Sequence, residues 1–190
     1  MNEATWIILL HQLLFQGLFL IKNLSLKLKL GQPIRGKNPE ANAAVLFFVV
    51  FILASLYLAM GQPGAMSLQL LPQGIATGLC LLLLCCNLLF GVAALRDLGE
   101  SWRVGVIEEQ QTTLVESGVY RFSRNPYFVS YLLLFAAYTL LLQNLGLLAL
   151  SFIGGKLVHS MILKEEAYLS SVHGAAYAQY KTRVPRYLLL

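Results

Sequence analysis

Long apolar segments constrain the fold of this chain more than any other feature of its sequence. A helix needs about 20 apolar residues to cross the hydrocarbon core of a membrane, and five segments approach or reach that length. They cover residues 5–21, 41–60, 75–95, 127–142 and 145–163. Only 12% of the 190 residues are charged, whereas a soluble domain carries about 25%. We therefore predict one all-α integral membrane domain over residues 1–190, with about five transmembrane helices.

The first segment and the last two carry further predictions. Residues 5–21 lack the basic start and the small-residue cleavage site of a signal peptide, so we expect a retained helix. Only Gln143 and Asn144 separate the fourth segment from the fifth, which predicts a tight helical hairpin. The fourth segment is short for a span, so we expect it to be either tilted or partly re-entrant.

Basic residues alternate between the connections of these segments, and this alternation predicts an orientation in the membrane. The basic residues of the first connection, the third connection and the tail are Lys22, Lys27, Lys29, Arg35, Lys37, Arg96, Arg103, Arg121, Arg124, Lys164, Lys181, Arg183 and Arg186. Residues 61–74 and 143–144 carry no charge. Because cytoplasmic loops are enriched in Lys and Arg, we expect an outer N-terminus and a cytoplasmic C-terminus. The small size favours a prokaryotic inner membrane.

Two other classes of partner are disfavoured. The net charge of +5 follows from the basic loops, so we expect membrane lipids and no nucleic acid as partners. The three cysteines, Cys80, Cys85 and Cys86, lie in one apolar run without the spacing of a zinc site or a disulfide framework. We therefore expect buried thiols and no bound metal.

A polar cluster lies on the predicted cytoplasmic side. Gly118 permits a tight turn or a close backbone approach to a ligand. Pro126 fits the first turn of a helix, so the fourth helix should begin there and attract an anion through its unpaired N–H groups. Arg124 adds a bidentate clamp for a carboxylate or a phosphate. The alternative interpretation is that Arg121 and Arg124 bind lipid phosphates.

A pair of carboxylates and a polar tail follow the fifth segment. Glu165 and Glu166 stand at its predicted cytoplasmic end, where carboxylates can bind an amino group or ribose hydroxyls. The alternative is a solvated helix end. Residues 167–183 repeat apolar side chains every three to four positions, which predicts an amphipathic cytoplasmic helix that Pro185 ends. A position on the membrane surface is one interpretation of this helix.

The order and spacing of these residues resemble a known family. The positions that carry the resemblance are Leu98, Gly99, Trp102, Leu114, Val115, Gly118, Tyr120, Arg124, Pro126, Glu165, Glu166, Tyr177, Tyr180, Val184 and Pro185. Together they are similar to the isoprenylcysteine carboxyl methyltransferases, and the related phospholipid N-methyltransferases look similar as well. The resemblance covers residues 98–186 and implies that this part binds the cofactor and carries the catalysis.

The resemblance implies a binding site for S-adenosylmethionine. The residues that it places against this cofactor are Thr112, Thr113, Leu114, Val115, Gly118, Tyr120, Asn125, Pro126, Tyr127, Phe128, Glu165 and Glu166. It gives catalytic roles to Arg124, which would take the cofactor carboxylate, and to Glu165, which would take its ammonium group and ribose. The C-terminal tail would fold over the bound cofactor.

Three positions depart from the pattern of that family. Asn125 stands where the family usually has histidine, and Phe128 stands where it has tyrosine. Asn125 keeps hydrogen bonding but does not titrate near neutral pH. Met161 stands where the prenylcysteine enzymes carry a substrate-binding arginine, which argues against a prenylcysteine carboxylate as the acceptor.

We therefore predict an S-adenosylmethionine-dependent integral membrane methyltransferase whose acceptor is a lipid-like or membrane-embedded carboxylate, thiol or amine. The leaving group is neutral, so positioning and exclusion of water can carry the catalysis. Of the histidines, His159 lies where it could face the site, although a packed, neutral side chain is the more common outcome. Two alternatives stay open: an NADPH-dependent membrane reductase related to sterol reductases, and a non-catalytic lipid-binding membrane protein.

Overall fold

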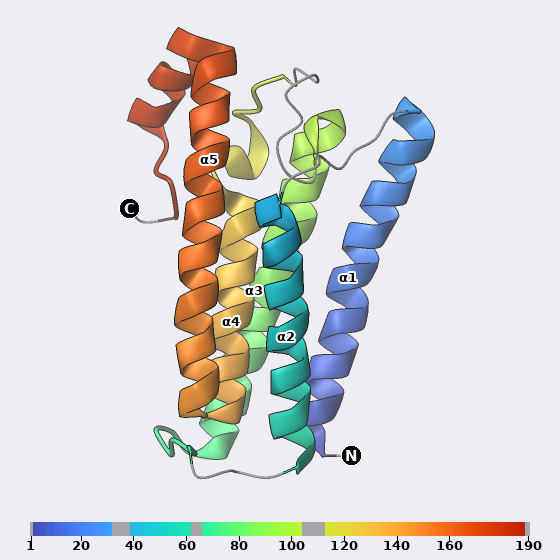
Figure 1. Ribbon diagram of the computed structural model, residues 1–190, viewed down its shortest axis with the longest axis vertical. Helices are drawn as coiled ribbons and strands as arrows, with labels where there is room; N and C mark the ends of the chain where they lie inside the picture. Colours follow the sequence, from blue (N-terminus) through green and yellow to red (C-terminus); the bar gives the residue numbers. More distant parts are fainter. Residues whose placement is uncertain (1, 32–38, 62–65, 104–112, 189–190) are drawn as a thin grey trace.

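Long helices that lie side by side make up most of the molecule (Figure 1). The computed structural model describes residues 2–31, 39–61, 66–103 and 113–188. The long helices in these ranges are α1 (Glu3–Leu30), α2 (Pro39–Gly61), α3 (Gln73–Leu98), α4 (Pro126–Leu142) and α5 (Leu145–Arg183). Two short 3-10 turns, Gly99–Ser101 and Gly118–Arg121, lie where α3 ends and α4 begins. We call this end of the bundle the polar end.

The apolar segments predicted from the sequence are confirmed as helices. By length and composition, α1, α2, α3 and α5 can each cross a membrane, whereas α4, with 17 residues, is shorter. Several helices extend past the apolar runs. The clearest case is α1, which continues to Leu30 through Lys22, Lys27 and Lys29. Lysine has a high helix propensity, so the loss of hydrophobicity does not itself end the helix.

The predicted hairpin of α4 and α5 is also confirmed. Gln143 ends α4 in the left-handed conformation, with φ 42°. The Asn144 side chain caps α5 by accepting a hydrogen bond from the Leu147 backbone N–H at 3.2 Å. Gln143 also binds the segment before α3, because its side-chain oxygen accepts from the Leu71 N–H at 2.8 Å. These contacts fix the two-residue turn at the end of the bundle opposite the polar end.

The end of the fifth helix differs from the prediction. Instead of ending near residue 163, α5 runs for 39 residues to Arg183, and Gly174, with φ 50° and ψ −120°, interrupts it. The helix predicted over residues 167–183 is therefore confirmed, but it continues α5. At 1.5 Å per residue, about 20 residues already cover the roughly 30 Å of hydrocarbon, so the second half of α5 extends beyond it. After Gly174 the chain turns back toward the bundle (Figure 1), and Tyr177 and Tyr180 are buried there. One face of this part of the tail therefore packs on protein.

A close approach at Gly154 sets the distance between α5 and its neighbours. A Cβ atom at this position would lie 2.7 Å from ring carbons of Phe135 in α4 and of Phe47 in α2. The rings of Phe51 and Phe135 meet at a steep angle with centroids 4.8 Å apart, and both side chains are buried. The core between α2, α4 and α5 is therefore built from aromatic rings around a glycine.

A chain of hydrogen bonds crosses the bundle and ties α1 to α3 and α4. The Asn87 side chain donates to the Ser130 carbonyl at 2.6 Å, so its own oxygen accepts the Nε2–H of His11 at 2.8 Å. Nδ1 of His11 accepts from the Tyr138 hydroxyl at 2.8 Å, and Gln12 donates to that hydroxyl at 2.9 Å. Each donor in this chain has an acceptor, as buried polar groups require.

Candidate functional site

A cavity of about 800 Å³ lies at the polar end and extends between the helices. Side chains from α1, α2, α4, α5 and the loop before α4 line it. Its polar part includes Ser101, Thr113, Asn125 and Glu165, and its apolar part includes Phe47, Phe48, Ile52, Phe135 and Leu157. One continuous space thus joins a polar compartment to an apolar one that reaches into the membrane helices.

The loop before α4 is held over the cavity by Asp97 at the end of α3. The Asp97 carboxylate accepts a hydrogen bond from the Val119 backbone N–H at 2.9 Å. Gly118 has a φ of +61°, and a Cβ atom there would overlap this carboxylate. Glycine alone satisfies both conditions without strain. The turn places Tyr120 against the cavity, where burial raises the pKa of its phenol, so the group stays protonated.

Aromatic side chains form the wall of the cavity next to α1. The Trp102 indole N–H donates to the Asn23 side chain at 2.9 Å, and its ring meets that of Tyr127 edge to face with centroids 4.6 Å apart. The hydroxyl of Tyr127 lies 3.3 Å from that of Tyr131. All four residues line the cavity. Faces and edges of this kind hold planar or cationic ligands.

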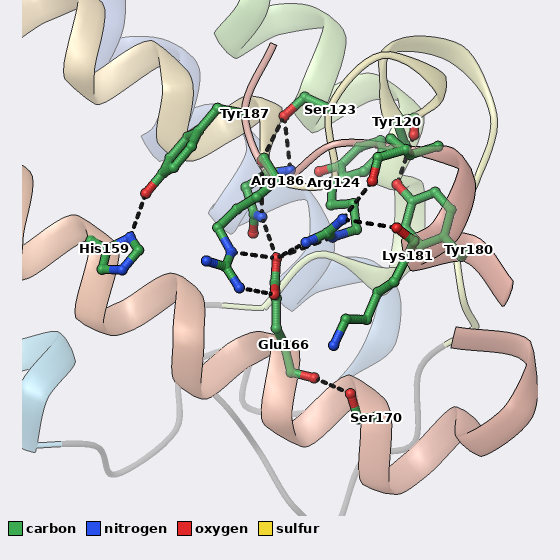
Figure 2. A network of polar contacts seen from close by, with 12 residues as sticks. Tyr120, Ser123, Arg124, His159, Glu166, Ser170, Tyr180, Lys181, Arg186 and Tyr187 are labelled. Atoms are coloured by element: carbon green, nitrogen blue, oxygen red, sulfur yellow. Dashed lines mark hydrogen bonds and ion pairs between the residues drawn. The ribbon is translucent and has the colours of Figure 1, made fainter. Parts of the chain in front are cut away.

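Glu166 is the centre of a set of ion pairs beside the cavity, which we call the Glu166 cluster (Figure 2). Arg124 approaches Glu166 Oε1 with Nε and with Nη2, each at 3.1 Å. Arg186 binds the same carboxylate through Nε at 3.2 Å and Nη2 at 2.9 Å. The Asn125 side chain donates to Oε1 at 3.1 Å. Glu166 is buried, and groups of the protein engage both oxygens of its carboxylate.

The C-terminal tail is fastened over the start of α4. The Asn125 side chain donates a second hydrogen bond to the Arg186 carbonyl at 3.2 Å. The Tyr180 hydroxyl donates to the Tyr120 carbonyl at 2.7 Å (Figure 2). Tyr180 also lines the cavity. The tail therefore covers the polar compartment and is part of its wall.

Most of the residues predicted for the site come together in this cavity. Those that line it are Thr113, Leu114, Val115, Tyr120, Arg124, Asn125, Tyr127, Phe128 and Glu165. Gly118, Pro126 and Glu166 lie beside it but are not among the lining residues. Thr112 lies outside the residues that the structure describes. Glu165 lines the cavity and Glu166 does not, because adjacent side chains on a helix point about 100° apart.

Sequence reasoning missed part of the wall that α1 contributes. Gln12, Gln16 and Asn23 line the cavity. The sequence could have indicated them, since all three are amide side chains within or next to an apolar segment. Polar side chains in a membrane segment usually face the interior of the protein. His159 differs from the expectation that it could face the site: it lies on the outer face of α5, where Nδ1 and the Tyr187 hydroxyl form a hydrogen bond of 2.7 Å.

Charged, hydrogen-bonding and aromatic side chains line the cavity. None of the histidines His11, His159 and His173 lines it. Within the described ranges of the chain, no group of three or more His, Cys, Asp or Glu side chains is placed to hold a metal ion. The titratable groups that reach the space include the carboxylate of Glu165 and the phenol of Tyr120.

Comparison with known proteins identifies the family of this chain. The sequence model of the phospholipid methyltransferase family matches residues 75–176, more than half of the chain. The chain is also 32% identical over 124 residues to a protein-S-isoprenylcysteine O-methyltransferase of Saccharomyces cerevisiae, a match that covers 62% of this chain and 52% of that relative. The chain thus spans about half the length of this relative. It is an integral membrane protein, and it belongs to the phospholipid methyltransferase family.

Proposed function

We propose that the protein transfers a methyl group from S-adenosylmethionine to a lipid-like acceptor held between its helices. The observation that carries this proposal is the continuity of the cavity, whose polar compartment holds Glu165 and whose apolar compartment holds Phe47 and Phe135. A polar, charged cofactor and an apolar acceptor need such adjoining compartments. Membership of a methyltransferase family supports the same class of reaction.

The donor groups of the polar compartment fit S-adenosylmethionine. Glu165 would bind the ammonium group or the ribose hydroxyls, and Leu114 and Val115 would offer an apolar wall to the adenine. Tyr127 and Phe128 follow Pro126 in the first turn of α4, where free backbone N–H groups favour a carboxylate. A cavity of about 800 Å³ is within the usual range for small-molecule sites.

Arg124 takes a different role from the one expected of it. Its guanidinium is engaged by Glu166 at 3.1 Å, so we assign it to positioning and not to direct capture of the cofactor carboxylate. Through Arg124 and Asn125, the Glu166 cluster fixes the start of α4 and the tail relative to each other. The cavity wall keeps its shape because this cluster is satisfied within the protein.

The apolar compartment indicates the class of acceptor. Phe48, Ile52 and Leu157 would pack on a hydrocarbon chain that enters between the helices. Met161, which also lines the cavity, provides no charge for an acceptor carboxylate. The relative in yeast is named for isoprenylcysteine and the family for phospholipids, and a lipid-like acceptor suits both names.

Catalysis would rest on orientation and on exclusion of water. When bound, S-adenosylmethionine supplies an electrophilic methyl group whose transfer leaves a neutral thioether. The protein therefore needs no acid for the leaving group, and its part is to align the acceptor with that methyl group. The tail with Tyr180 and the loop with Tyr120 would keep water from the reacting atoms. Because α1 and α2 also line the cavity, we treat residues 1–190 as one catalytic domain in which residues 98–186 bind the cofactor.

The first test is calorimetric titration of the detergent-purified protein with S-adenosylhomocysteine. We expect micromolar binding that Glu165→Gln abolishes, because the variant replaces the carboxyl group that would bind the cofactor's ammonium group or ribose hydroxyls. Glu3→Gln is the matched control: it makes the same change at the start of α1 and should bind normally. A folded wild-type protein that binds NADPH but not S-adenosylhomocysteine would contradict the proposal. The bound protein would then be assayed with lipid carboxylates, thiols and amines.

The proposal includes the orientation predicted from the loop charges, with the N-terminus outside and the C-terminus in the cytoplasm. With the polar end in the cytoplasm, the cofactor would enter from its cellular pool and the acceptor from the bilayer. Labelling of single cysteines with a membrane-impermeant reagent tests this. A cysteine at Lys181 should be protected in sealed right-side-out vesicles and react after permeabilisation.

A further inference from the structure

The outer face of α5 carries polar side chains among residues that face lipid. Phe152, Ile153 and Leu163 are exposed on this helix, as expected in hydrocarbon. Lys156 and His159 are exposed on the same stretch. A lysine within a membrane segment is costly unless its ammonium group reaches the interface or meets an anion. The position of Lys156 therefore calls for a partner.

Phe152, Lys156, His159 and Leu163 line a groove of about 530 Å³ along α5, between α4 and the tail, which we call the outer groove. It is separate from the large cavity, since the two share no lining residue. Its lining combines apolar side chains, among them Leu132 and Phe152, with the polar side chains of Lys156, His159 and Ser160. A groove of this composition matches a molecule with an acyl chain next to a charged headgroup.

The described residues that line the outer groove carry a positive charge, on Lys156. Among the residues described, none that lines the groove is acidic, and Lys156 makes no ion pair. The hydroxyl of Ser160 and the ring of His159 also line the groove and add hydrogen-bonding groups. They are nearer to the polar end than Lys156, and a lysine side chain can extend toward the interface along the helix. Together these groups are complementary to a phosphate.

We propose that the outer groove binds an anionic phospholipid of the surrounding bilayer. Lys156, His159 and Ser160 would contact its phosphate, and one acyl chain would lie on Leu132 and Phe152. A lipid is the occupant that the position favours, because the groove is on a membrane-spanning helix beside exposed apolar side chains. This site does not depend on methyl transfer.

The outer groove is connected to the tail through Tyr187. This residue lines the groove, and its hydroxyl forms the 2.7 Å hydrogen bond with Nδ1 of His159 (Figure 2). The two rings also stack, with centroids 6.2 Å apart. Arg186, the preceding residue, binds Glu166 at 2.9 Å. A lipid that packs on His159 and Tyr187 would therefore also stabilise the tail over the large cavity.

The binding step is tested by native mass spectrometry of the full-length protein in detergent. The protein is titrated with phosphatidylglycerol or with phosphatidylcholine of the same acyl chains. Wild type should bind one phosphatidylglycerol about tenfold more tightly than phosphatidylcholine, as expected of one charge-assisted contact. Lys156→Gln should remove this preference. Lys27→Gln, which makes the same change on α1, should keep it. Equal affinity of wild type for both lipids, or an unchanged preference in Lys156→Gln, would overturn the proposal.

The connection to the tail is tested by hydrogen exchange in lipid nanodiscs. Addition of phosphatidylglycerol to phosphatidylcholine should slow amide exchange in residues 184–188 of wild type several-fold, and should not do so in Lys156→Gln. Tyr187→Phe should still bind the lipid but lose most of this protection, because the hydrogen bond to His159 is gone. Lipid binding without slower exchange in wild type would refute the connection.

Discussion

Arg124 pairs with Glu166, while the adjacent Glu165 faces the cavity. Arg124 Nη2 lies 3.1 Å from Glu166 Oε1, and the two side chains are only 9% and 5% exposed. Glu165 is instead one of the residues that line the large cavity. Two neighbouring carboxylates thus have different tasks: one holds α4, α5 and the tail together, and the other is available to a ligand.

Removal of the Glu166 charge should destabilise the protein strongly. Glu166→Gln leaves the buried guanidinium group of Arg124 without its anion, together with that of the half-buried Arg186. The loss of one partner of a buried pair costs about 3 kcal/mol. Thermal unfolding of the purified protein measures the effect. Glu116→Gln is the control, because Glu116 and its partner Arg183 are 34% and 58% exposed and such pairs contribute less than about 1 kcal/mol. Equal shifts of the melting temperature would contradict this role of the cluster.

Gly154 and Gly155 should respond in opposite ways to alanine. In Gly154→Ala the new methyl group would meet the rings of Phe135 and Phe47 at 2.7 Å, and overpacking of this kind costs roughly 1–3 kcal/mol. At Gly155 the nearest atom is 4.0 Å away, so the higher helix propensity of alanine should stabilise the helix by up to about 1 kcal/mol. The melting temperatures of both variants, compared with wild type, test these opposite effects on stability. A Gly154→Ala variant as stable as Gly155→Ala would show that the rings can move aside.

The turn at Gly118 should be more sensitive to substitution than the turn at Gly99. Both glycines have positive φ values, +61° and +54°, so alanine costs about 1 kcal/mol or more at either position. Only at Gly118 would the methyl group displace the Asp97 carboxylate, which accepts the Val119 N–H. We therefore expect Gly118→Ala to weaken binding of S-adenosylhomocysteine at least tenfold more than Gly99→Ala. The same affinity in both variants would show that the loop does not depend on Asp97.

The hydrogen bonds of His11 should contribute to stability through Tyr138. Tyr138→Phe removes the donor to His11 Nδ1 and the acceptor of Gln12. Buried polar groups left without partners cost about 1–3 kcal/mol, so the melting temperature should fall. Tyr57→Phe removes the same hydroxyl from an exposed tyrosine of α2 and should leave the melting temperature unchanged. A similar melting temperature for both variants would mean that water or another group replaces the Tyr138 hydroxyl.

Much of the fold was open to prediction because membrane helices must be apolar and satisfy their own backbone hydrogen bonds. The apolar runs located each long helix, and Gln143 and Asn144 located the hairpin turn. Helix ends outside the membrane were less certain, because polar residues such as Lys29 or Glu166 can continue a helix. This is why α1 and α5 extend beyond the predicted segments.

The candidate site was predicted as a group of residues but not as an arrangement. The sequence placed Arg124, Glu165 and Glu166 at one end of the bundle. It did not indicate which carboxylate faces the arginine, because that choice depends on the rotation of α5 about its axis. The packing of Gly154 on Phe135 is one of the contacts that fix this rotation.

By itself the sequence determined the membrane class, the order of the helices and the family, since each depends on composition or on motifs along the chain. Only the tertiary structure decided which groups share a space. His11, Asn87 and Tyr138 come from three helices, and Arg186 reaches Glu166 only because the chain reverses at Gly174. Contacts between distant segments depend on how helices pack and rotate, and no local pattern specifies that geometry.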